Sequence, residues 1–440
     1  MGFNTALQRL DGTSPSDLST IRRQQVTDRL PLLFLALAIL CTEFIPPLPV
    51  YLQLTNTLAF GTIVAGALAI LLVLANTTII ATKRRHLTLA DASMNSLLFV
   101  GVLIALICVH GVLAARLVPM DSQRFVLSLI PLSFLLAGGL ALGSALRNAS
   151  PDDLHNVSWI CFWVFVGIVI QRLLGLEPRA AAFNKPTFPF TETSHFALAF
   201  GPIYLYRSVT APRQHKVMWI AFGLALAVVL KSATLVAFAF GAALLCRRLL
   251  LLMLAVTVVL LAGATAHLSY FTSRADISSH SKNISALVYL QGWEFIWRSL
   301  RLTHGWGLGF QQLGIHPFNL SVSRIIREMN NGKTLNTMGG SFTFSKLASE
   351  FGVFGVALGI TYLYFCFRSI RILRSTESFR SDTLARCIVV AFGVDMFVRG
   401  IGYFYGDALL FLGAASSLAP AYALLRHGVS RDRRKLLVLH

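Results

Sequence analysis

Acidic residues are scarce in this chain of 440 residues. Only 19 residues are Asp or Glu, against 38 Lys and Arg, and charged residues of both signs make up 13% of the sequence. An average soluble domain carries charges at about a quarter of its positions, so this composition excludes an ordinary water-soluble fold. The basic residues are not gathered into one face with interleaved aromatics, as nucleic-acid binding requires. They fall between apolar segments instead.

Cysteine is also rare, and its six residues lack the spacing of metal ligands. They fall in or at the edge of apolar stretches, which predicts free thiols and neither a zinc site nor a disulfide framework. These residues are Cys41, Cys108, Cys161, Cys246, Cys366 and Cys387. A Ser-His-Asp order, a Walker sequence and an HExxH motif are missing too, so the sequence carries none of these signatures of hydrolases, NTPases or metalloproteases.

Long apolar runs are what the sequence does contain. Hydrophobic residues make up 55% of it, and its mean hydropathy is +0.68. A membrane-spanning helix needs about 20 apolar residues, so about twelve such helices would account for this share. We therefore predict an all-α polytopic membrane protein. The expected helices lie near residues 30–47, 57–81, 94–115, 125–146, 157–176, 195–208, 217–230, 232–246, 249–268, 350–367, 385–402 and 407–425.

The positions of Lys and Arg orient these helices. Basic residues are enriched in short cytoplasmic loops, and the chain fits this rule with both termini in the cytoplasm. No cleavage site follows the polar first residues, so the first apolar segment is expected to be an anchor. The expected divisions are a cytoplasmic tail at 1–29, nine helices at 30–268, a large outer loop with short helices of its own at 269–349, three helices at 350–426 and a basic cytoplasmic tail at 427–440.

The apolar stretch 217–246 has a polar interruption at Lys231. Both of its flanks are basic, so the two halves should form a hairpin with Lys231 near its outer tip. Each half has about 14 residues and a length of about 21 Å, which is less than the roughly 30 Å hydrocarbon core of a bilayer. We therefore expect the tip to line a water-filled depression, where an ionisable group is tolerated.

A first candidate site joins the fifth expected helix to the sixth. Arg172 and Arg179 offer charge-assisted donors to a phosphate, and the sixth helix, capped by a hydroxyl residue, adds free N–H groups. Glu192 and His195 are three positions apart and would share a helical face, where they could supply a general base. The alternative is a capped helix beside a solvated loop, with a hydrogen-bonded interfacial histidine.

A second candidate site lies in the large outer loop. Residues 285–301 have the apolar spacing of an amphipathic helix, and Arg274 precedes it. Glu294, Arg298 and Arg301 lie on a polar face of this helix. The spacing of Glu294 and Arg298 is typical of a surface ion pair.

Asp395 and Arg399, four apart in the expected eleventh helix, form a third constellation. Charges at membrane depth are costly unless they pair or face a cavity, and mutual neutralisation is the simpler interpretation. Glu43 is expected to be incidental. The outer cations exceed what topology requires, so they need an anionic partner such as a membrane-anchored phosphate or pyrophosphate. These cations are Arg172, Arg179, Lys231, Arg274, Arg298, Arg301 and Arg399.

Three stretches jointly resemble the bacterial O-antigen polymerase and ligase superfamily, of the Wzy and WaaL type. The first runs from Arg172 to His195 and continues into Phe-Ala-Leu. The second runs from Asn-Ile-Ser-Ala-Leu-Val-Tyr-Leu-Gln-Gly-Trp at 283–293 into Gly-Trp-Gly-Leu-Gly-Phe at 305–310. The third is Ser-Phe-Thr-Phe-Ser-Lys-Leu-Ala-Ser-Glu-Phe-Gly-Val-Phe-Gly at 341–355. The resemblance rests on the order and spacing of these stretches.

The resemblance implies a metal-independent glycosyltransferase of the bacterial inner membrane with a GT-C-like fold and a site that faces the periplasm. No cofactor is implied. Its donor and acceptor would be undecaprenyl-pyrophosphate-linked glycans, and its partners membrane lipid, a flippase and a chain-length regulator. Family arginines that hold the pyrophosphate correspond to Arg172, Arg274 and Arg298, which Lys231 would assist.

One departure from the family separates two activities. Ligases place a His-Asn pair where this chain has Gly340-Ser341, which favours a polymerase that builds O-antigen, capsule or exopolysaccharide over a ligase. Glu192 and His195 are then the candidates for the general base, with His304 behind them. A flippase or transporter is the alternative without chemistry. Three tryptophans could stack on sugar faces or simply pack: Trp293, Trp297 and Trp306.

Overall fold

The computed structural model describes residues 15–84, 89–176, 186–248, 278, 281, 283–316, 318, 320–375 and 380–419. Within these residues the chain forms helices and no strand, which confirms the all-α prediction. The helix expected at 249–268 lies outside the described residues, as do residues 1–14 and 420–440 at the two ends of the chain.

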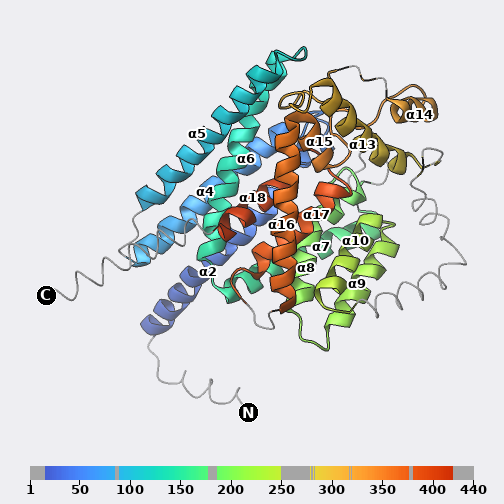
Figure 1. The fold of residues 1–440 in the computed structure, drawn as a ribbon. Coiled ribbons are helices and arrows are strands. Elements are labelled where there is room, and N and C mark those ends of the chain that lie inside the picture. Colours follow the sequence, from blue (N-terminus) through green and yellow to red (C-terminus); the bar gives the residue numbers. More distant parts are fainter. Residues whose placement is uncertain are drawn as a thin grey trace, which may run out of the picture.

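The first half of the chain packs as a bundle of long helices (Figure 1). They are α2 (Pro15–Phe44), the short α3 (Leu48–Tyr51), α4 (Ala59–Arg84), α5 (Leu89–Ala114), α6 (Ser122–Asn148), α7 (Pro151–Leu173) and α8 (Thr193–Thr210). The second half adds α9 (Lys216–Val229), α10 (Ala233–Leu245), α13 (Ile284–Leu302), α14 (Ser321–Met329), α15 (Thr343–Phe351), α16 (Val353–Ser375), α17 (Thr383–Phe397) and α18 (Gly406–Leu418).

Five described helical segments are long and apolar enough to cross a membrane. These are Ala59–Thr78, Leu97–Ala114, Ser122–Asn148, Pro151–Leu173 and Val353–Ser375. Shorter apolar helices accompany them at Leu30–Phe44, Lys216–Val229, Ala233–Leu245 and Gly406–Leu418. The prediction of several apolar, membrane-length helices is therefore confirmed.

Two helices begin at residues other than those expected, and each difference has a local cause. α7 begins six residues before the expected start, because Ser150 and Asp153 form a capping box in which Asp153 N donates to Ser150 Oγ at 3.1 Å. The helix expected at 350–367 is α16, which begins three residues later than expected because another helix, α15, ends just before it. Gly352, with φ +59°, separates α15 from α16, and a side chain there would collide with the carbonyl oxygen of Gly305.

Small residues let the long helices approach closely. Gly66 of α4 faces Gly138 of α6, and a Cβ built on Gly138 would lie 2.9 Å from the Cα of Gly66. The same helix meets α18 where Gly143 lies against Gly413 and Ser416. Small-residue contacts of this kind are typical of helix pairs in membranes, where backbone proximity strengthens packing.

The segment expected as a large loop contains three helices, α13, α14 and α15, gathered at one end of the bundle (Figure 1). Glu294 does not pair with Arg298 as expected. Its carboxylate instead accepts hydrogen bonds from Ser321 N at 2.9 Å and Val322 N at 3.1 Å, and so caps the amino end of α14. Helix termini with unpaired N–H groups compete successfully for a carboxylate that a surface ion pair holds only weakly.

A buried ion pair anchors α15 to the chain around it. Lys346 Nζ lies 3.0 Å from Glu350 Oε1, and both side chains are almost completely buried. The Glu350 carboxylate also accepts from Gln311 N and Leu313 N, at 2.9 and 3.2 Å. Burial lowers the pKa of the Lys346 ammonium, an effect that the charge of Glu350 opposes.

Candidate functional site

A cavity of about 420 Å³ lies where the amino end of α8, the α9–α10 tip, the start of α13 and the segment after α17 meet. Its volume is in the usual range for small-molecule sites. The residues that line it are Glu192, Thr193, Ser194, Lys231, Ser232, Ala233, Thr234, Asn283, Ser285, Ala286, Val288, Tyr289, Ser341, Phe397, Val398 and Arg399. Three predicted site residues, Glu192, Lys231 and Arg399, are thus brought together from distant parts of the sequence.

The amino end of α8 forms one wall of the cavity. Glu192, rather than a hydroxyl residue, is the N-cap, with an extended backbone and no side-chain capping bond, so the predicted hydroxyl cap is wrong. Glu192 is therefore not helical and does not share a helical face with His195. The His195 ring contacts Thr191, with Nδ1 3.0 Å from Oγ1, and is absent from the cavity lining.

Arg399 and Glu192, which both line the cavity, form an ion pair. Arg399 Nη2 donates to Glu192 Oε2 at 2.7 Å, and the two side chains are 23% and 48% exposed. The predicted pairing of Arg399 with Asp395 is wrong, because α17 ends at Phe397 and the chain turns before Arg399. Asp395 instead accepts a hydrogen bond from Thr343 Oγ1 at 2.7 Å.

The electrostatic surroundings keep Glu192 ionised. Burial alone would raise the pKa of its carboxyl, but the charges of Arg399 and His195 lower it, and the balance leaves the pKa below its usual value. Ser194 Oγ also donates to Glu192 Oε2, at 2.9 Å. The carboxylate is therefore available as a proton acceptor at neutral pH.

Lys231 lies at the tip of the α9–α10 hairpin, as predicted. Its backbone is left-handed, with φ +50°, and Ser232 caps α10 by accepting from Leu235 N at 3.4 Å. A non-glycine residue in this conformation costs about 1 kcal/mol. The turn therefore places an exposed ammonium at the cavity wall at some cost to stability.

Ser341 lines the cavity, and sequence reasoning missed it. Its φ is +72°, its side chain is buried, and its hydroxyl oxygen has no hydrogen-bond partner among the described residues. Its carbonyl accepts from Gly400 N at 3.2 Å, which ties the segment before α15 to the one that carries Arg399. Strained residues with unsatisfied polar groups are typical of functional sites. In the sequence, the two glycines of Gly339-Gly340-Ser341 were the available signal of an unusual backbone at this position.

The other predicted cations lie apart from this cavity or outside the described residues. Arg172 donates hydrogen bonds to Thr187 and, at 2.6 Å, to Thr193 Oγ1. It therefore holds the side chain of Thr193, the first residue of α8, in place. Arg298 and Arg301 lie on the exposed face of α13, and neither lines the cavity. Two predicted pyrophosphate ligands, Arg179 and Arg274, lie outside the described residues.

The predicted aromatic residues fall into two groups. Trp293 is 43% exposed and packs on Phe342 beside the cavity-lining Tyr289, whereas Trp297 is 68% exposed. Trp306 stacks on His110, with ring centroids 5.5 Å apart, and does not line the cavity. The remaining candidate base, His304, is exposed in the turn after α13, away from the cavity.

A cluster of buried acidic residues was also missed. Glu43 at the end of α2 is fully buried, and its carboxylate interacts electrostatically with Asp407 of α18 and Asp395 of α17. Neither oxygen of Glu43 has a hydrogen-bond partner among the described residues. The expectation that Glu43 is incidental is not supported by this placement, since its cluster reaches α15 through the Thr343–Asp395 hydrogen bond.

No protein-family model, curated protein or solved structure matches the chain. Among the described residues, no group of three His, Cys, Asp or Glu side chains is placed to hold a metal ion. The arrangement at the cavity combines two cations, the positive end of a helix dipole and an ionised carboxylate. Such a site can bind a phosphate and accept a proton next to it.

Proposed function

We propose that the chain is a polysaccharide polymerase of the Wzy type, a glycosyltransferase that acts on lipid-pyrophosphate-linked glycans. The observation that carries the proposal is the cavity in which Lys231, Arg399 and the amino end of α8 surround one space beside the Glu192 carboxylate. Cations and helix N–H groups stabilise phosphate oxygens, and a nearby ionised carboxylate can activate a hydroxyl group.

The proposed reaction exchanges one C–O bond at the anomeric carbon for another and transfers one proton. A hydroxyl of the acceptor sugar attacks the anomeric carbon of the donor glycan while its bond to the pyrophosphate oxygen breaks. Lys231 and Arg399 neutralise the negative charge that develops on the leaving pyrophosphate, and Glu192 takes the hydroxyl proton. The reaction needs no external oxidant, reductant or nucleotide.

The proposal includes the membrane arrangement. About twelve helices cross the bacterial inner membrane with both termini in the cytoplasm, and α13–α15 and the cavity face the periplasm. The apolar α9–α10 hairpin, with Lys231 at its tip, supports this orientation, because both basic flanks then lie in the cytoplasm. A flippase and a chain-length regulator are the proposed partners.

The test is chain elongation by the purified protein. Incubated with a synthetic undecaprenyl-pyrophosphate-linked repeat unit, it should produce a ladder of longer lipid-linked glycans in mass spectrometry. The Glu192→Gln variant should lose the ladder, and an Arg301→Gln variant, changed outside the cavity, should keep it. Failure of the wild-type protein to extend any lipid-linked repeat would overturn the proposal.

A ligase is the second candidate, and cells lacking the gene distinguish it. A polymerase mutant leaves single repeat units on the final acceptor, whereas a ligase mutant leaves none. Gly340-Ser341 favours the polymerase, because these two residues stand where ligases have a His-Asn pair. A lipid-linked oligosaccharide flippase would move the substrate across a vesicle membrane and yield no elongated product.

A further inference from the structure

A second cavity lies at the opposite ends of α8, α9, α10 and α17. α8 begins at the candidate site and ends in this cavity, so its 18 residues separate the two by about 27 Å. The cavity has a volume of about 610 Å³ and is completed by the last turn of α16. The proposed topology places it on the cytoplasmic side, so substrate at the candidate site does not reach it.

The lining of this cavity is strongly basic, and we refer to it as the basic pocket. Its charged residues are Arg213, Lys216, Arg247, Arg248, Arg374, Arg380, Arg386 and Asp382, or seven cations and one anion. They come from four separate chain segments that the fold brings together.

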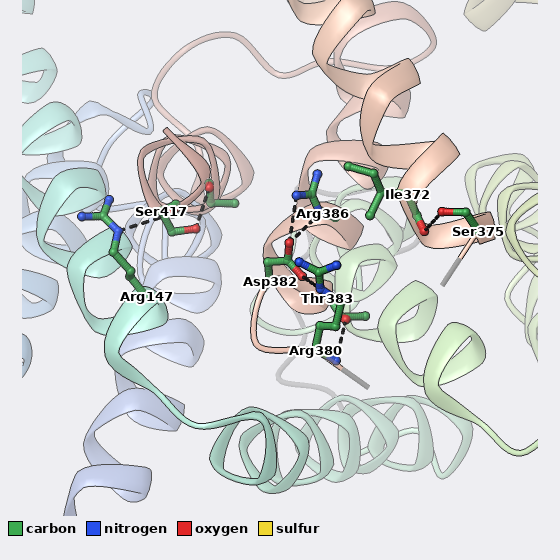
Figure 2. A network of polar contacts seen from close by, with 9 residues as sticks. Arg147, Ile372, Ser375, Arg380, Asp382, Thr383, Arg386 and Ser417 are labelled. Carbon is green, nitrogen blue, oxygen red and sulfur yellow. Dashed lines mark hydrogen bonds and ion pairs between the residues drawn. The ribbon is translucent and has the colours of Figure 1, made fainter. Parts of the chain in front are cut away.

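The one carboxylate is already occupied. Arg386 Nη2 lies 2.8 Å and Arg380 Nε 3.3 Å from the Asp382 carboxylate, and Figure 2 shows the three side chains beside one another. The five other cations have no carboxylate within ion-pair distance among the described residues. The described residues therefore give the pocket a large uncompensated positive charge.

The tendency of short cytoplasmic loops to be basic does not account for this arrangement. That tendency fixes the side of the membrane on which Lys and Arg lie, but not their convergence on a single hollow. Other basic residues of the same end, such as Arg368 and Arg371 of α16, are exposed and do not line the pocket. Convergent like charges repel one another unless an anion lies among them.

We propose that the basic pocket binds a phosphate-bearing anion, supplied either by the headgroup of an anionic phospholipid or by a free diphosphate. Guanidinium groups match phosphate oxygens with paired hydrogen bonds, and several of them around one hollow favour a multiply charged ligand over chloride. The inference goes beyond the proposed glycosyl transfer and stands without it, because it concerns a different cavity.

The test compares two double variants of the purified full-length protein. Arg213→Gln/Arg247→Gln removes two pocket cations, and Arg368→Gln/Arg371→Gln removes the same charge from α16 outside the pocket. In one arm, radiolabelled pyrophosphate binding is measured on protein in zwitterionic nanodiscs. In the other, native mass spectrometry counts the phosphatidylglycerol retained by protein in detergent.

We expect the pocket variant to lose about 100-fold in affinity for pyrophosphate if the source is soluble, or its retained phosphatidylglycerol if the source is lipid. The control variant should match the wild type in both arms. An Arg213→Lys/Arg247→Lys variant, which keeps the charge, should retain part of the binding. It is the control for a loss of binding that is caused by misfolding and not by the loss of charge. Equal behaviour of pocket and control variants in both arms would overturn the proposal.

Discussion

Arg399 Nη2 lies 2.7 Å from Glu192 Oε2, although 207 positions separate the two residues in the sequence. The contact joins the start of α8 to the segment that follows α17, and it is partly open to solvent. A pair in this setting can exchange partners when a substrate enters, since exposed ion pairs contribute little to stability. In the proposed reaction, Arg399 then binds the pyrophosphate and Glu192 accepts a proton.

Removing the cavity cations should abolish elongation. We expect Arg399→Gln or Lys231→Gln to slow the formation of the glycan ladder by about 100- to 1,000-fold, the usual effect of losing one preorganised donor to developing charge. Arg298→Gln and Arg301→Gln, on the exposed face of α13, serve as matched controls and should slow it less than tenfold. If the α13 variants are the more damaged, the pyrophosphate binds over α13 instead.

The pH profile of elongation should depend on Arg399. Because Arg399 and His195 hold the pKa of Glu192 below its usual value, the wild-type carboxylate stays ionised, and active as a base, well into the acidic range. The Arg399→Gln variant loses that charge while burial remains, so the acid limb of its residual activity should move to higher pH. Rates are compared at saturating substrate, and an unmoved acid limb would remove Glu192 from the role of base.

Ser341 allows the hydroxyl and the backbone to be tested separately. Ser341→Ala and Ser341→Gly both remove the unpartnered hydroxyl, so both should slow elongation if it contacts substrate. Ser341→Gly also relieves the left-handed backbone, and should be more stable than Ser341→Ala by about 1 kcal/mol. Thermal unfolding in detergent measures this difference. Wild-type rates in both variants would assign Ser341 to the fold alone.

The Lys346–Glu350 pair should hold the α13–α15 region together. Lys346→Met leaves a buried carboxylate with only backbone donors, which should cost about 3 to 5 kcal/mol. The double variant Lys346→Met/Glu350→Gln should cost clearly less than the sum of the single changes, since no uncompensated charge remains. A cycle of unfolding measurements tests this, and additive single effects would contradict it.

The sequence predicts the helices well because each long apolar run must cover its polar backbone with internal hydrogen bonds. The turn between α9 and α10 is also predictable, because the charged Lys231 interrupts an apolar run. The sequence misses the start of α7 and the break at Gly352, because these depend on a capping box and on the approach of Gly305. Neither the capping box nor this close approach leaves a pattern of apolar residues in the sequence.

The candidate site was predictable only in part. Glu192, Lys231 and Arg399 stand out as charges where charges are costly, but their mutual contact depends on helix packing over long sequence distances. Asp395 and Glu294 show the limit of spacing rules: each has an arginine four residues on, and each binds a different partner. Ser341 is a serine among glycines, and only its φ and its burial distinguish it.

The α9–α10 hairpin has a further consequence for the lipid around it. Helices of 14 and 13 residues reach about 20 Å, roughly 10 Å less than the hydrocarbon thickness of an average bilayer. In the proposed membrane arrangement, the neighbouring lipids thin to meet the hairpin, or water follows Lys231 inward. A polyprenyl carrier diffusing in the outer leaflet would then meet a dimple in the membrane, where its charged head can slide sideways to the protein without first rising into the aqueous phase.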